Sequence, residues 1–281
     1  MISLNRNRLQ EPGSRFPYIS VTVLALIAAG CIIGSIVYSD SAYYMELSKI
    51  SMAPGKGHIF GTDTLGRDLF SVIWCGGRIS LTVGLLATLI STVIAVIYGA
   101  AAGLASQKVD DAMMRFTEIL MSVPQMLFVM FLQAMMGEAN VISISVVIGV
   151  TGWMAVAKMV RSEVRQLRSS GFVMAARSMG GGFFYILYRH LMPNFMSAVM
   201  FMIVTNIGGA ISMEATLSFL GLGLPAEIVS WGSLMSLSQR AMLTGAWWIL
   251  IIPGIFLVIT LICITEIGEY LRCRGRRDRL M

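Results

Sequence analysis

The stretch FVMAARSMGGGFFYILYRHLMPN, residues 172–194, separates two long apolar runs and carries the most specific pattern of the chain. Alanine and methionine favour a helix that ends near Met179, and the glycines from Gly180 onward suit a helix terminus. A second helical segment is expected from Phe183 to Leu191, ahead of Pro193. We predict a short helix followed by a turn, which is either a docking surface for a partner or an ordinary interfacial helix.

The apolar runs around this stretch indicate a membrane protein. Hydrophobic residues make up 56% of the 281 residues and charged residues only 13%, whereas soluble domains carry about 25% charged residues. A spanning helix needs about 20 mostly apolar residues. We therefore predict an all-α integral membrane protein with six transmembrane helices. The predicted spans are 16–38, 79–104, 113–136, 141–160, 196–220 and 247–270.

Lysine and arginine predict the orientation of these spans, because cytoplasmic loops of membrane proteins are enriched in both. Most of the 21 basic residues fall in the leader 1–15, after the second and fourth spans, and in the tail 271–281. Six spans place all these segments on one side, so both termini are predicted to be cytoplasmic. Residues 161–195 then form a cytoplasmic loop, and 39–78 and 221–246 form external segments.

Among the polar side chains inside predicted spans, three stand out, because burying a charge or an amide there is costly and suggests a role. Glu118 lies in the inner part of the third span, and Glu214 in the outer half of the fifth. Asn206 precedes Glu214 by two helical turns and lies near the same helix face. All three are candidates for a translocation path. The alternative is hydrogen bonding between helices, and for Glu118 an ion pair with Arg115.

Recognisable catalytic and cofactor motifs are absent from the sequence. It contains no G-x-x-x-x-G-K-[ST] phosphate loop, no H-E-x-x-H pair and no C-x-x-C spacing. Its two histidines, His58 and His190, fall on opposite sides of the predicted membrane. We therefore predict no catalytic residue, no metal site and no cofactor bound by this chain. Nucleic-acid binding is not expected either, because the basic residues cluster beside spans as membrane orientation requires.

Residues 172–194 resemble the signature by which ABC-importer permeases are identified. Ala175-Ala176, Gly180 and Pro193 match it, whereas Met174 stands where the family has a glutamate. The wider string is similar to the peptide/nickel class, in particular to dipeptide and oligopeptide permease "C" subunits. Further matching segments follow in the family's order: HIFGTDTLGRD (58–68), KVDDAMMR (108–115) with Pro124, EATLSFLGLG (214–223) with SWG (230–232), and Pro253-Gly254.

The resemblance implies a type I ABC-importer-like permease with residues 16–270 as its transmembrane domain, in the bacterial cytoplasmic membrane. It implies a pore shared with a second, homologous permease, an external or periplasmic binding protein that delivers substrate, and two cytoplasmic ATPases that carry the Mg·ATP. The ATPases would dock on residues 172–193, the coupling segment. The implied docking residues are Met174, Ala175, Ala176, Arg177, Gly180 and Pro193.

On this resemblance the GTDTLGRD segment is expected to form a cap near the outer gate. Asp63, Arg67 and Asp68 would be held there by mutual ion pairs and backbone turns. A structural loop is favoured over direct contact with substrate.

The cargo favoured by the resemblance is a short peptide, with nickel or a metal chelate as the alternative. The 22 methionines are scattered along apolar runs, which favours core packing over soft-metal binding. Alternatives of a different class are an ion-gradient secondary transporter and a receptor or scaffold without transport. A secondary transporter is expected to show inverted repeats and midplane charges, and the sequence shows no clear repeat.

Overall fold

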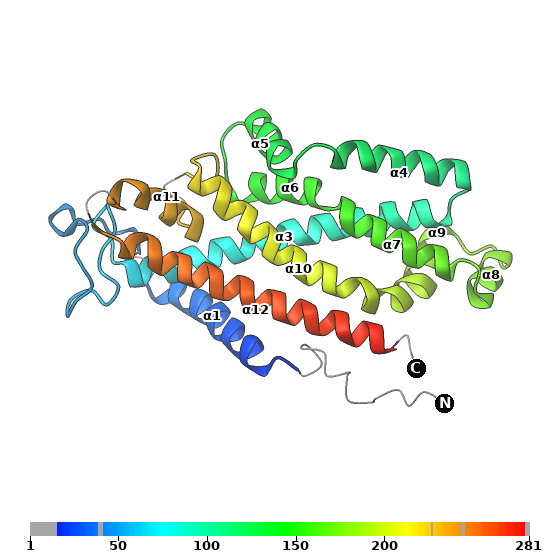
Figure 1. The fold of residues 1–281 in the computed structure, drawn as a ribbon, viewed down its shortest axis with the longest axis horizontal. Helices are drawn as coiled ribbons and strands as arrows, with labels where there is room; N and C mark the ends of the chain where they lie inside the picture. The colour runs from blue at the N-terminus through cyan, green and yellow to red at the C-terminus, as the bar shows by residue number, and fades with distance from the viewer. Residues whose placement is uncertain (1–15, 39–41, 226, 243–244, 279–281) are drawn as a thin grey trace, which may run out of the picture.

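The computed structural model describes residues 16–38, 42–225, 227–242 and 245–278, which are almost entirely helical (Figure 1). The long helices follow one common axis, with α8 near one end of the bundle and the loop after α1 at the other. In the described residues the only β feature is an isolated bridge between Thr62 and Asp68. The predicted all-α fold is confirmed.

Within the described residues, four helical runs are long and apolar enough to cross a membrane on their own, and two bent pairs raise the number of candidate spans to as many as six. Six spans agree with the prediction. The four runs are α1 (Tyr18–Val37), α3 (Leu69–Leu104), α9 to α10 (Phe183–Phe219) and α12 (Trp248–Asp278). The bent pairs are α4 (Gln107–Met121) with α5 (Gln125–Met136) and α6 (Val141–Gly152) with α7 (Met154–Leu167).

Shorter helices connect these runs. They are η2 (Leu47–Lys49), α8 (Gly171–Ser178) and α11 (Trp231–Ala241), while the run from Phe183 to Phe219 is made of α9 (Phe183–Ile186), the π-helical η3 (Leu187–Leu191) and α10 (Met192–Phe219).

The third and fourth predicted spans are broken rather than straight. Pro124 lies at the first break, where α4 and α5 meet at 84°, as expected of a residue that lacks an N–H and clashes with the preceding turn. The second break lies at Trp153, where α6 and α7 meet at 45°, and the sequence has no proline at this position that would predict it. By contrast, α12 continues through Pro253.

Several helix boundaries differ from the prediction, and α4, for example, begins at Gln107 rather than at residue 113. α3 begins at Leu69 rather than at residue 79, because Asp68 caps its first turn and accepts hydrogen bonds from Ser71 N (3.1 Å) and Ser71 Oγ (2.9 Å). α7 continues to Leu167, into the predicted cytoplasmic loop, and α12 extends into the predicted basic tail.

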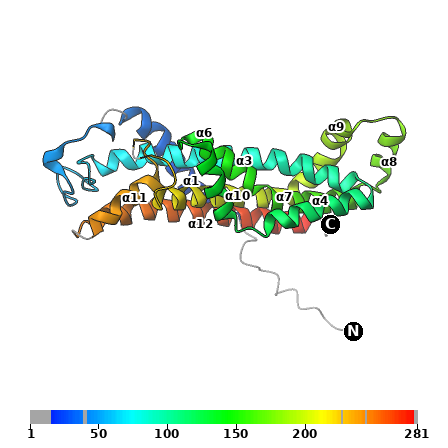
Figure 2. The same cartoon turned by 90° about the horizontal axis from the view of Figure 1, so that it is seen from above.

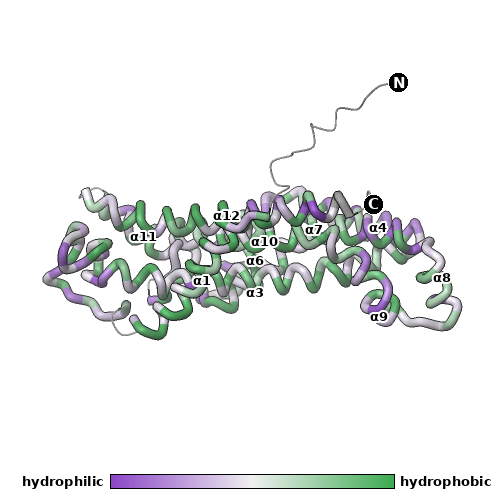
Figure 3. The backbone as a smooth tube through the Cα atoms, turned by 90° about the horizontal axis from the view of Figure 1, so that it is seen from below, coloured by the Kyte–Doolittle hydropathy of each residue, from purple (hydrophilic) through white to green (hydrophobic). Residues whose placement is uncertain are grey.

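α3 is the central helix and packs against α1, α6, α7 and α10 (Figure 2). Glycines allow these close approaches. A Cβ at Gly99 would lie 2.5 Å from the carbonyl oxygen of Ala157, and one at Gly103 would lie 2.7 Å from Val164 Cγ1. Small residues at such positions let helices pack tightly in lipid, where the hydrophobic effect does not drive association. Hydrophilic residues gather mainly toward the two ends of the bundle (Figure 3).

Candidate functional site

The predicted helix end at Gly180 is confirmed, and it is a Schellman motif. Gly181 N donates to the carbonyl oxygen of Ala176 (3.0 Å), and Gly180 N donates to that of Arg177 (3.0 Å). Gly180 has φ +81°, a left-handed conformation that glycine adopts without strain. The turn is therefore specified locally, by the residue type at one position.

The two faces of α8 differ in burial. Val173 and Ala176 are buried and belong to a core shared with α7 and η3. Met174, Ala175 and Arg177 are exposed. α8 and α9 lie at one end of the bundle (Figure 2). The helix is thus anchored on one side and offers the other to a partner.

Five large apolar side chains in and after α8 are exposed, between 42% and 81% each. An exposed apolar surface of this kind marks a contact with another protein or with lipid. The residues are Phe172, Met179, Phe184, Tyr185 and Tyr188.

Pro193 lies in the first turn of α10, where its missing N–H does not interrupt the helix. The turn before it is π-helical, and Asn194 Nδ2 donates to the carbonyl oxygen of His190 (2.6 Å). The helix predicted from Phe183 to Leu191 is confirmed, and it runs on into α10. A displacement of α9 would therefore act directly on the N-terminal end of α10, with which it is continuous.

Glu214 is fully buried at the centre of a hydrogen-bonded cluster. Its carboxylate accepts hydrogen bonds from Ser80 Oγ (2.9 Å), Ser218 Oγ (2.9 Å) and Ser230 Oγ (2.7 Å). Ser230 also caps α11 by accepting from Ser233 N (3.0 Å). The cluster joins α3, α10 and α11, so the geometry matches the interhelical alternative for Glu214.

Sequence reasoning missed the three serines, which come from segments far apart in the chain. Ser218 and Ser230 lie inside the matched EATLSFLGLG and SWG segments. Their place in these segments was the one feature of the sequence that could have indicated a role for them. Trp231 strengthens the same junction, because its backbone N–H donates to Ser80 Oγ (3.2 Å) and its indole N–H to the carbonyl oxygen of Ile73 (3.1 Å).

Asn206 lies where both helix breaks meet. Its Nδ2 donates to Ser91 Oγ (2.7 Å). A Cβ built on Gly152, beside the α6–α7 break, would lie 3.7 Å from Asn206 Oδ1 and 3.7 Å from Nε2 of Gln125, the first residue of α5. The structure thus places an amide of α10 between two discontinuous helices.

Glu118 pairs with Arg115 as the alternative interpretation expected, at 3.5 Å between Oε2 and Nη1. Its Oε1 also lies 3.9 Å from Lys158 Nζ on α7. Glu118 is 50% exposed and lines a cavity of about 550 Å³ between α4 and α7, together with Asp111 and Arg161. It therefore faces open space, unlike Glu214.

Residues 58–71 form a compact structure that we call the external cap. Asp63 and Arg67 are both buried, and Arg67 Nε donates to Asp63 Oδ2 (2.7 Å), so the predicted ion pair is present. Asp68 pairs instead with His58, at 2.9 Å between Oδ1 and Nδ1. Gly66 has φ +75°, and a Cβ there would overlap the carbonyl oxygen of Glu46.

The cap is also tied to its neighbours. Trp248 Nε1, at the start of α12, donates to the carbonyl oxygen of Thr62 (3.2 Å). Glu46 and Lys49 pair beside the cap at 2.7 Å, and this contact lowers the pKa of the carboxyl and raises the pKa of the ammonium. The cap is thus fixed by bonds within the chain.

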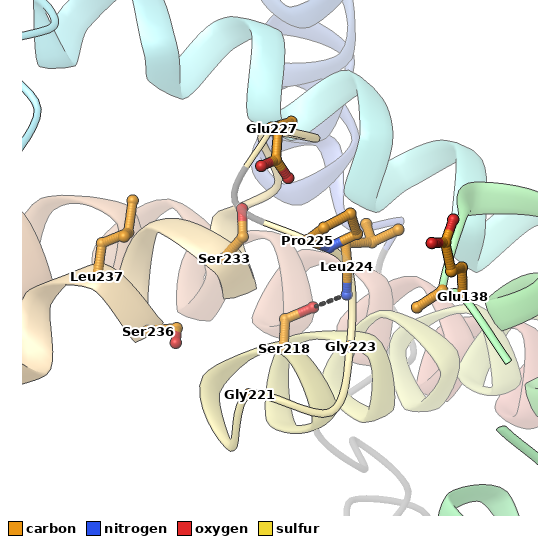
Figure 4. Close-up of a pocket in the computed structure, with 11 residues that line it drawn as sticks. Glu138, Ser218, Gly221, Gly223, Leu224, Pro225, Glu227, Ser233, Ser236 and Leu237 are labelled. Atoms are coloured by element: carbon orange, nitrogen blue, oxygen red, sulfur yellow. Dashed lines mark hydrogen bonds between the residues drawn. The ribbon is translucent and has the colours of Figure 1, made fainter. Parts of the chain in front are cut away.

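A further cavity of about 540 Å³ lies between the α5–α6 turn and the α10–α11 segment (Figure 4). Glu138 comes from the first of these and Glu227 from the second, and Ser218 Oγ accepts from Leu224 N (3.1 Å) in its wall. Among the described residues no group of three or more His, Cys, Asp or Glu side chains lies close enough to hold a metal ion.

Residues 91–272 match the sequence model of a family described as "binding-protein-dependent transport system inner membrane component". The chain is 35% identical to the dipeptide transport system permease protein DppC of Bacillus subtilis, covering 96% of this chain and 82% of that protein. It is 41% identical to the oligopeptide transport system permease protein OppC of Haemophilus influenzae, covering 84% and 74%. It is 38% identical to OppC of Escherichia coli, covering 90% and 84%.

One solved structure supports the fold. A chain of the MetNI methionine ABC transporter in an inward-facing conformation aligns with a TM-score of 0.55 at 15% identity, covering 73% of this chain and 96% of that one. The helical arrangement is therefore that of an ABC transporter permease.

Proposed function

Since the chain belongs to the family of binding-protein-dependent transport system inner membrane components, we propose that it is a permease subunit of a di- or oligopeptide ABC importer. The observation that carries this assignment is 35–41% identity to DppC and OppC permeases over most of the chain. The subunit is a multi-span inner membrane component and is not catalytic. ATP hydrolysis belongs to its partners.

The coupling segment is the proposed docking surface for a cytoplasmic ATPase. The support is its geometry: α8 is anchored by Val173 and Ala176 and presents Met174, Ala175 and Arg177 outward. Met174 is 55% exposed, so in place of the family's glutamate it offers apolar contact area rather than a charge. Because the ATPase is cytoplasmic, its docking on the coupling segment implies that this segment, both termini and the basic tail lie on the cytoplasmic side of the membrane.

The translocation path is proposed to run past Asn206 and Glu118. Asn206 sits at two helix breaks, and membrane transporters form substrate paths where discontinuous helices meet. Glu118 lines the cavity between α4 and α7. Glu214 contributes indirectly, by holding α11 in place. A second, homologous permease completes the pore. A binding protein delivers substrate at the end of the bundle that carries the external cap.

Uptake by the reconstituted complex tests this function. The chain would be purified with its partners, placed in liposomes with Mg·ATP inside, and supplied with the binding protein and a mixed library of di- and tripeptides. We expect uptake of library peptides, measured by mass spectrometry, that requires both ATP and the binding protein.

Two outcomes would contradict the proposal. Accumulation of nickel or a metal chelate without peptide uptake would move the assignment to the metal branch of the class. Uptake driven by a proton or sodium gradient, with no need for ATP or a binding protein, would make the chain a secondary transporter.

A further inference from the structure

Arg161 and Arg165 of α7 and Arg168, the C-cap residue of that helix, converge on the turn between α3 and α4. Arg161 and Arg165 both bind Asp110, a residue of the first turn of α4 that is only 1% exposed. Arg161 donates from Nε (2.5 Å) and Nη2 (2.6 Å), and Arg165 from Nη1 (2.8 Å). Arg168 Nη1 donates to the carbonyl oxygens of Gly103 (3.3 Å) and Ala105 (3.4 Å), at the end of α3.

The spacing of these arginines places them on one face of α7. Positions four and three residues apart lie one above the other on a helix, so all three guanidinium groups reach the same neighbour. A guanidinium that meets a carboxylate with two donors forms a directional bond, stronger than a contact between single charges. We call this group of Asp110, Arg161 and Arg165 the Asp110 clamp.

α4 has few other attachments to the bundle. It packs against α3 and α7, and its buried residues are Asp110, Met114 and Thr117. A hydrogen bond from Tyr98 OH to the carbonyl oxygen of Met113 (2.7 Å) adds one polar contact. The clamp is thus the closest charged contact between α4 and α7, beside a longer one of 3.9 Å from Glu118 to Lys158. Past the break at Pro124, α4 continues into α5, which packs against α6.

α7 in turn leads directly into the coupling segment. Only the residues 168–170 separate the end of α7 from the start of α8, and Ser170 N donates back to the carbonyl oxygen of Leu167 (2.9 Å). A displacement of α8 is therefore passed to the end of α7, where Arg165 and the C-cap residue Arg168 lie. Through the clamp, the same displacement reaches α4.

We propose that Asp110 is a positioning residue that makes α4, and with it the broken α4–α5 pair, follow α7 when the coupling segment moves. This inference rests on the proposed function, because it assigns a role within ATP-driven transport. A merely structural ion pair would stabilise the chain without affecting how much transport each ATP produces. The ratio of peptide imported to ATP hydrolysed separates the two roles.

Asp110→Asn tests the proposal, since it keeps the shape of the side chain and removes the charge. Lys108→Gln is the matched control, because Lys108 lies in the same first turn of α4, is exposed, and has no side-chain hydrogen bond or ion pair among the contacts described. Both variants would be reconstituted with the partner permease, the ATPases and the binding protein, using the same peptide library.

We expect Asp110→Asn complexes to hydrolyse ATP within about twofold of the parent while importing at least about tenfold less peptide per ATP. Lys108→Gln should leave the ratio unchanged. Arg165→Gln removes a single guanidinium and should give an intermediate ratio, which keeps the test available if Asp110→Asn fails to assemble.

An unchanged ratio in assembled Asp110→Asn or Arg165→Gln complexes would overturn the proposal, as would hydrolysis and uptake that fall in proportion. Failure of the proposed function looks different, because then the parent complex itself would show no ATP-dependent peptide uptake.

Discussion

The external cap (58–71) and the coupling segment (172–193) lie at opposite ends of the bundle and are built in opposite ways (Figure 1). In the cap the buried pair Asp63–Arg67 and the capping residue Asp68 find their partners within the chain. In the coupling segment the predicted docking residues Met174, Ala175 and Arg177 are exposed. The difference teaches that one motif specifies a local structure and the other an exposed surface, which we propose is the docking surface.

This comparison predicts that cap variants lose stability and coupling-segment variants lose coupling. The largest loss of stability is expected for Arg67→Leu, which leaves the carboxylate of Asp63 buried without its ion pair. Breaking a buried pair in this way costs about 3–5 kcal/mol. Thermal unfolding in detergent measures the change, with Lys56→Leu, an exposed position beside the cap, as the control. Equal melting temperatures for the two variants would remove the distinction on which the comparison depends.

The Glu214 cluster resembles the cap and should respond in the same way, with a smaller effect. Ser230→Ala removes one donor to Glu214 and the cap of α11, and each loss costs about 1 kcal/mol. The free energy of unfolding should therefore fall by about 2 kcal/mol, as measured by denaturant titration. Ser236→Ala, on the same helix and only half-buried, is the control and should stay within about 0.5 kcal/mol of the parent.

Gly180→Val probes the coupling segment. A β-branched residue at φ +81° costs about 1–2 kcal/mol, so the chain should still insert and fold. The turn after α8 should be disturbed, and ATP hydrolysis by the complex should become uncoupled from peptide uptake. Gly182→Val is the matched control, since its backbone is extended and a Cβ there meets nothing within 4 Å. Parental uptake per ATP by Gly180→Val at normal expression would refute the docking assignment.

Met174→Glu should have the smallest effect on stability, since the side chain is exposed on the outward face of α8. It restores the residue that the family signature carries at this position. We expect a melting temperature equal to that of the parent and a change in the affinity for the ATPase, measured by titration of the purified subunits. An unchanged affinity would show that position 174 lies outside the docking surface.

Local signals predicted much of the molecule. Gly180 marked the end of α8 because a left-handed helix terminus favours glycine, and Pro124 marked the α4–α5 break because proline removes an N–H. The start of α3 was missed because apolar content alone gave residue 79. The side chain that sets the boundary is Asp68, a polar residue outside the apolar run.

Tertiary contacts lay beyond sequence reasoning. The break at Trp153 carries no proline. The serine partners of Glu214 come from three helices, and Asp110 meets Arg161 from a position 51 residues away. Charges in or beside predicted spans indicated that such partners should exist, but only the fold decides which side chains meet.

Site-specific photo-cross-linking from α8 tests the central claim most directly. A photoreactive amino acid would replace the exposed Ala175 in native membranes, with exposed Lys56 beside the external cap as the second site. We predict that position 175 captures an ATP-binding-cassette ATPase, identified by mass spectrometry, and that position 56 does not. Capture of the ATPase from position 56, or of lipid alone from position 175, would contradict the account.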